Sequence, residues 1–141
     1  MAASSPARLY AVLVGGALTF AGIVGFFYEA SFDTGSRLPS DEVFGLLAVN
    51  GWHNVVHLAT GLLGLAAAGY AARSYALGLG LVYVVIAIWG FLEVENGFGV
   101  LIDLLPVNTE DNFLHLILGV TGLAAGAATP GAAPATASRT A

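Results

Sequence analysis

Two stretches decide the fold: LLAVNGWHNVVHLATGLLGL at residues 46–65 and LLPVNTEDNFLHLILGVTGL at residues 104–123. Aligned with a shift of 58 residues, they are identical at ten of twenty positions, and both carry the pattern N-x-x-H-x-x-x-G-x-x-G. Further upstream, a shift of 65 residues pairs Tyr10 with Tyr75 and Gly15 with Gly80. Because self-similarity of this kind indicates one structural unit written twice, we predict a first repeat at about residues 8–72 and a second at about 75–128.

The composition is that of a membrane protein. Hydrophobic residues make up 57% of the 141 residues and charged residues only 9%, against roughly 25% charged in soluble domains. A membrane-spanning helix needs about 20 mostly apolar residues, and residues 9–28, 52–72, 75–92 and 112–128 meet this requirement. We therefore predict an all-α membrane protein with four transmembrane helices, built as two parallel-repeat helical hairpins.

The segments outside these helices are short. The stretches DEVFGLL at residues 41–47 and GFGVLIDLL at residues 97–105 are expected to form short interfacial helices on the outer side of the membrane. Residues 1–128 would then form one transmembrane domain. The remaining tail, residues 129–141, is rich in Pro, Ala and Thr and is expected to be disordered.

The charges predict an orientation. Arg8, Arg73 and Arg139 fall on one side of the expected spans, whereas all nine acidic residues fall on the other side with only Arg37. Under the positive-inside rule both termini are cytoplasmic, which predicts a multi-pass protein of a bacterial inner membrane.

The sequence also limits the partners and the chemistry. A net charge of −5 without clustered basic residues argues against nucleic acid as a partner. The expected environment is a lipid bilayer, with a membrane-protein partner or a homodimer as further options. The chain has no P-loop, G-x-S-x-G or H-E-x-x-H motif, so no enzymatic activity and no catalytic residue is predicted.

One face of the second helix in each repeat carries only small and polar residues. This small-polar stripe consists of Asn54, His57, Gly61 and Gly64 in the first copy and Asn112, His115, Gly119 and Gly122 in the second. Small residues let membrane helices approach closely, and polar side chains hydrogen-bond across them. The stripe therefore predicts a helix-packing surface that holds the two hairpins together, in a protein that is structural or accessory to a larger membrane complex.

A second interpretation gives the same histidines a ligand. His57 and His115 are expected at equal depth and could bind haem or a divalent metal ion in an electron-transfer protein. His53 lies four residues before His57, and Asp111 four before His115, so both could add metal ligands. These two residues, however, are expected in exposed first turns of their helices. A permease is disfavoured because the inner halves of the expected spans lack charged groups.

The repeated N-x-x-H-L-x-x-G-x-x-G-L pattern and the four-span layout resemble a family of small bacterial integral membrane proteins, catalogued as domain-of-unknown-function family 4383. The resemblance covers about residues 8–126. It implies a four-helix integral membrane fold and no established activity, so it assigns no role to any residue.

Overall fold

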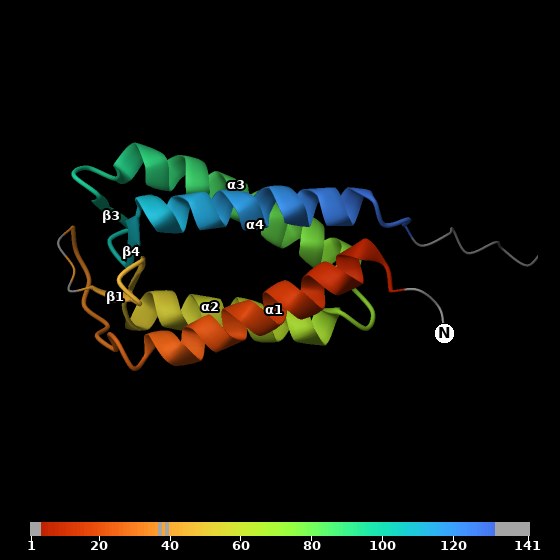
Figure 1. Cartoon of the computed structure of the whole chain (residues 1–141), viewed down its shortest axis with the longest axis horizontal. Helices are drawn as coiled ribbons and strands as arrows, with labels where there is room; N and C mark the ends of the chain where they lie inside the picture. Colours follow the sequence, from red (N-terminus) through yellow and green to blue (C-terminus); the bar gives the residue numbers. More distant parts are fainter. Residues whose placement is uncertain (1–3, 37, 39, 132–141) are drawn as a thin grey trace, which may run out of the picture.

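The computed structural model describes residues 4–36, 38 and 40–131, and it is mostly helical. In chain order the elements are α1 (Pro6–Gly25), β1 (Asp41–Val43), β2 (Leu47–Val49), α2 (Gly51–Ala67), α3 (Ala72–Glu93), β3 (Phe98–Leu101), β4 (Leu105–Asn108) and α4 (Thr109–Ala127). The order helix, strand, strand, helix thus occurs twice. In Figure 1, α1 lies beside α2 and α3 beside α4.

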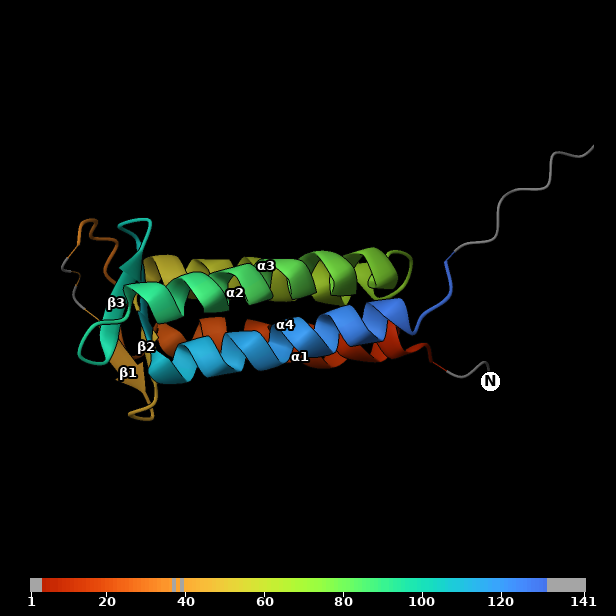
Figure 2. The same ribbon diagram turned by 90° about the horizontal axis from the view of Figure 1, so that it is seen from above.

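The strands lie together at one end of the bundle. Figure 2 shows them at the ends where α2 and α4 begin, while the first described residues and the turn from α2 to α3 lie at the opposite end. Arg8 and Arg73 belong to that opposite end. Two further arginines of the orientation argument, Arg37 and Arg139, lie outside the described residues.

Asparagine caps fix where α2 and α4 begin. The Asn50 side chain accepts a hydrogen bond from the N–H of His53, and the Asn108 side chain accepts one from the N–H of Asp111. Asp111 in turn accepts from the N–H of Asn108, which completes a capping box in the second copy. The pattern places His57 and His115 at the same position, two turns into their helices.

The prediction of interfacial helices at residues 41–47 and 97–105 is wrong, because both segments belong to antiparallel β-hairpins. β1 pairs with β2 and β3 with β4. The residues that open each turn have positive φ: 56° at Phe44 and 68° at Gly45, then 49° at Ile102 and 57° at Asp103. Two consecutive left-handed residues cannot continue a right-handed helix. Valines in the flanking segments favour strands, which is a local signal that the apolar character of these stretches concealed.

Large apolar side chains point outward from all four helices. The most exposed include Leu13 at 62% and Phe20 at 64% in α1, Leu63 at 58% in α2, Leu81 at 58% in α3 and Ile117 at 58% in α4. Two helices among the described residues, α1 and α3, are long and apolar enough to cross a membrane. The bundle is thus apolar on the outside, as a lipid-facing surface requires.

Glycines let the two helices of each half pack closely. A Cβ at Gly15 of α1 would lie 2.9 Å from the carbonyl oxygen of Gly61 in α2, and a Cβ at Gly80 of α3 would lie 2.9 Å from that of Gly119 in α4. The two contacts are equivalent under the repeat. Gly61 and Gly119 of the small-polar stripe therefore pack helices within a half.

Two tyrosines join the halves across the bundle. The Tyr10 hydroxyl of α1 donates to the carbonyl of Leu118 in α4 over 2.8 Å, and the Tyr75 hydroxyl of α3 donates to that of Thr60 in α2 over 3.1 Å. Their rings fill the space above two other glycines of the stripe, Gly122 and Gly64 respectively. These last two glycines thus serve packing between the halves.

Thr129, the first residue of the expected disordered tail, makes hydrogen bonds in the structure. Thr129 accepts hydrogen bonds from the Ala7 N–H at its hydroxyl and from Arg73 Nε at its carbonyl, both over 2.9 Å. This residue therefore ties the end of α4 to α1 and α3. Residues 132–141 lie outside the described residues.

We predict that Gly80→Ala destabilises the bundle and Gly78→Ala does not. A Cβ at Gly80 would lie 2.7 Å from the backbone nitrogen of Leu123 in α4, which is too close. By contrast, nothing lies within 4 Å of a Cβ at Gly78. We expect a loss of about 1–3 kcal/mol for Gly80→Ala, and an unchanged or higher Tm for Gly78→Ala because alanine favours helix. Thermal unfolding in detergent checks this pair. Equal Tm values would show that the close approach of α3 and α4 is not needed.

Candidate metal centre

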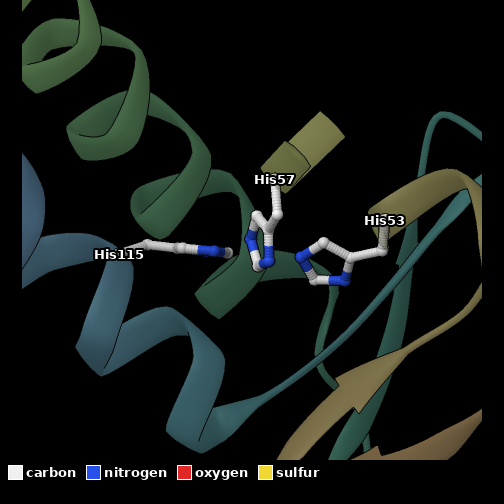
Figure 3. Close-up of side chains that lie close together, drawn as sticks. All are labelled: His53, His57 and His115. Atoms are coloured by element: carbon white, nitrogen blue, oxygen red, sulfur yellow. The ribbon is translucent and has the colours of Figure 1, made fainter. Parts of the chain in front are cut away.

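Three histidines meet between the two halves of the protein. His53 and His57 come from α2 and His115 from α4, and their ligand nitrogens all lie within 4.8 Å of one another. The ring centroids are 4.4 Å apart for His53 and His57 and 6.4 Å apart for His57 and His115. Figure 3 shows the three rings close together, and the His53 and His115 centroids are 6.1 Å apart, so the rings form a triangle. These are the only histidines of the chain.

His53 is not in an exposed first turn, contrary to the expectation from sequence. Its side chain is only 3% exposed, because the β3–β4 hairpin of the other half covers the beginning of α2. Leu101, Leu105 and Val107 of that hairpin line a small cavity of about 20 Å³ together with the three histidines. Once the segment is a hairpin rather than an interfacial helix, His53 becomes part of the interior.

Asp111 is buried as well, at 2% exposure, but it does not join the histidines. Its Oδ2 accepts hydrogen bonds of 3.0 Å from the backbone N–H groups of Ala48 and Asn108. In the repeat, Ala48 corresponds to Pro106 and Asp111 to His53. Proline has no N–H to donate, so a carboxylate at position 53 would lack the interaction that holds Asp111. The cluster therefore contains three imidazoles and no carboxylate.

Two ring nitrogens of the cluster have no internal partner. Nδ1 of His53 and Nδ1 of His115 are buried without a hydrogen-bond partner among the described residues. A buried polar atom left unpaired costs about 1–3 kcal/mol. A neutral imidazole offers a lone pair to a metal ion, so a bound ion would remove part of this cost.

Tyr83 is a residue of the site that the sequence did not indicate. Its ring stacks on His115 with a centroid distance of 5.0 Å and an interplanar angle of 21°, and it is 4% exposed. The repeat gave no signal for it because Leu18 stands at the equivalent position. Stacking fixes the orientation of the His115 ring toward the other two histidines.

The arrangement does not fit haem. A porphyrin between His57 and His115 needs a flat slot, and ligand sites of its size typically occupy at least about 300 Å³. The two cavities that border these histidines measure about 20 and 150 Å³. The donor set suits a single metal ion instead.

The asparagines of the stripe lie away from this cluster. Asn54 packs against Gly25 of α1, and Asn112 packs against Gly90 of α3. The Nδ2 of Asn54 also donates to the carbonyl of Glu29 over 2.8 Å. Both asparagines thus act in helix packing within a half. His57 and His115, the next residues of the stripe, face the other half instead.

The capping asparagines hold the hairpins over the site. Asn50 Nδ2 donates to the carbonyl of Leu104 over 2.8 Å, and Asn108 Nδ2 donates to that of Leu46 over 2.7 Å. Leu46 and Leu104 are equivalent turn residues of the two β-hairpins. Each half therefore caps its own helix with an Asn oxygen and binds the turn of the other half with the Asn nitrogen.

Comparison with known proteins gives one match. The family model described as "Domain of unknown function (DUF4383)" matches residues 8–128, which confirms the resemblance found in the sequence. No curated protein and no solved structure matches the chain.

We predict that the two roles of Asn50 can be separated by substitution. Asn50→Ala removes the cap and the bond to Leu104, and we expect a loss of about 2 kcal/mol, about 1 from each. Asn50→Ser keeps a capping oxygen but not the Nδ2 donor, so we expect about half that loss. Chemical unfolding in detergent measures both values. Wild-type stability in Asn50→Ser would show that the bond to the other half contributes nothing, and equal losses in the two variants would show that the capping oxygen contributes nothing.

Proposed function

Because the chain belongs to the family described as a domain of unknown function, DUF4383, we propose its function from its geometry. The protein is a non-enzymatic integral membrane protein of the bacterial inner membrane that binds one transition metal ion through His53, His57 and His115. The observation that carries this proposal is that the ligand nitrogens of three buried histidines lie within 4.8 Å of one another.

The outward apolar surface supports a membrane environment for all four helices. At a rise of 1.5 Å per residue, the 17 residues of α2 and the 19 of α4 span about 26 and 28 Å. The hydrocarbon core is about 30 Å thick, so the polar first turns of these helices, covered by the β-hairpins, would reach the headgroups. Arg8 and Arg73 lie at the opposite end, which supports the proposal of cytoplasmic termini under the positive-inside rule.

The donor set favours zinc or copper. Imidazole nitrogens suit both ions, and three protein ligands leave a fourth position open. Bonds of about 2.0–2.1 Å in a tetrahedral site set nitrogen separations of about 3.3 Å. Since the nitrogens already lie within 4.8 Å, small rotations of the side chains are enough to bind the ion.

The bound ion would join the two halves. His53 and His57 belong to α2 in the first half and His115 to α4 in the second, so their common ligand would link the halves beneath the β-hairpins. This gives the structural or accessory role a physical basis. An electron-transfer role at the same site requires a redox-active ion such as copper, whereas zinc would support a structural role only. The identity of the bound metal therefore distinguishes the two roles.

The metal content of the purified protein tests the proposal. We expect about one zinc or copper ion per chain, measured by elemental mass spectrometry after purification through a tag without histidine. His53→Ala, His57→Ala and His115→Ala should each lose most of the ion, because two imidazoles bind more weakly than three. Asp111→Asn is the control and should keep the ion. Asp111 is equivalent to His53 in the repeat but lies outside the histidine cluster.

The proposal fails if wild-type protein, chelated and then offered zinc or copper in excess, holds neither ion. It also fails if the alanine variants retain the ion. Histidine variants that lose Tm in a protein without metal would instead support a role of the three rings in packing alone.

A further inference from the structure

A second cavity lies beside the histidines, and nothing in the metal site accounts for it. It measures about 150 Å³ and is lined by His57 and His115 together with Asp111, but not by His53. The rest of its wall is apolar and comes from α1, α4 and β2: Val14, Ala17, Leu18, Ala21, Leu47, Leu114 and Leu118. We call it the α1–α4 chamber.

The repeat explains why this chamber is empty of side chains. Its wall corresponds to that of the 20 Å³ cavity at His53, on the other side of the His57 and His115 pair. With the shift of 65 residues, Leu18 replaces Tyr83 and Ala21 replaces Ile86. The smaller residues Leu18 and Ala21 on α1 thus leave the chamber open. Tyr83 and Ile86 on α3 fill the equivalent space in the other cavity.

The chamber reaches the outer surface of the bundle between α1 and α4. Ala17 and Leu114 line it and are themselves exposed, on a surface that carries large apolar side chains. In a bilayer this surface faces lipid, so a molecule dissolved in the membrane could enter from the side.

We propose that the α1–α4 chamber binds a small aromatic molecule that carries a hydroxyl group. A mostly apolar cavity of about 150 Å³ accommodates a benzene-sized molecule, which sets the size of the occupant. The polar part of the wall consists of neutral imidazoles and a carboxylate, which offer acceptors for a hydroxyl proton. His115 lines the chamber, is only 4% exposed and has an unpartnered Nδ1, so when no ion holds this nitrogen it can accept a hydrogen bond from a hydroxyl group.

The inference rests on the membrane environment of the proposed function but not on its metal. The walls of the chamber on α1 and β2 include no residue of the proposed metal site. The experiment therefore uses chelator-treated full-length protein in detergent, while the metal content of untreated protein is measured separately. A protein that lacks metal but binds the aromatic probe contradicts only the metal centre, and the reverse result contradicts only the chamber.

Isothermal titration with phenol and with benzene is the test. We expect saturable binding of phenol, about threefold to tenfold tighter than benzene because of one added hydrogen bond. Leu18→Tyr and Ala21→Ile place the bulkier residues of the second half into the chamber and should abolish this binding. Leu13→Tyr is the control, because Leu13 lies on the same helix, is 62% exposed and does not line the chamber.

The outcomes separate the chamber from simple partition into detergent. Equal heats in wild type, Leu18→Tyr, Ala21→Ile and Leu13→Tyr would overturn the proposal, as would an absence of saturation. Equal affinities for phenol and benzene would overturn the role of the hydroxyl. Circular dichroism checks that the variants are folded. If Leu18→Tyr does not fold, Ala21→Ile alone decides the test.

A phenol with a ten-carbon chain distinguishes the source of the occupant. If it binds as tightly as phenol and competes with it, the opening between α1 and α4 admits a tail, and a membrane lipid with a phenolic head fits the chamber. If only phenol binds, the chamber takes a free molecule. Both results support the proposed site.

Discussion

The site depends on the reciprocal hydrogen bonds of Asn50 and Asn108. Each asparagine begins a helix with its oxygen and holds the turn of the opposite β-hairpin with its nitrogen. Because these bonds keep the hairpins over the ends of α2 and α4, His53 and Asp111 lie in the interior rather than in water. Without this cover, the first turns would be hydrated and the histidines would not share a dry environment.

The distribution of residue types agrees with the membrane environment proposed above. Around lipid there is no hydrophobic gain in burying leucine or phenylalanine, so packing and hydrogen bonds hold such helices together. This agrees with the many glycines, alanines and polar residues buried between the helices and with the large apolar residues on the outside, although aliphatic residues such as Leu18, Leu101 and Val107 are also buried. Close backbone approach at Gly15 and Gly80 brings the helices of each half together.

The sequence predicts the helical part of the fold. The caps at Asn50 and Asn108, the four helices and the equal placement of His57 and His115 follow from local patterns. The β-hairpins were missed because their apolar residues suit either an interfacial helix or a strand, and only the left-handed turn residues decide between them. That error made His53 look exposed. The burial of His53 is a contact between the halves, which no local pattern contains.

The two halves of the repeat differ at several positions beside the central pair of histidines, His57 and His115. Identical hairpins associating as a symmetric dimer would present the same surroundings on both sides of the central histidine pair. In this chain the two hairpins are fused, so each side can evolve separately. One side carries an imidazole, a proline and a stacked tyrosine, at His53, Pro106 and Tyr83, while the other carries a carboxylate, an alanine and a leucine at the equivalent positions. The two sides of the histidine pair therefore offer different chemistry to a ligand.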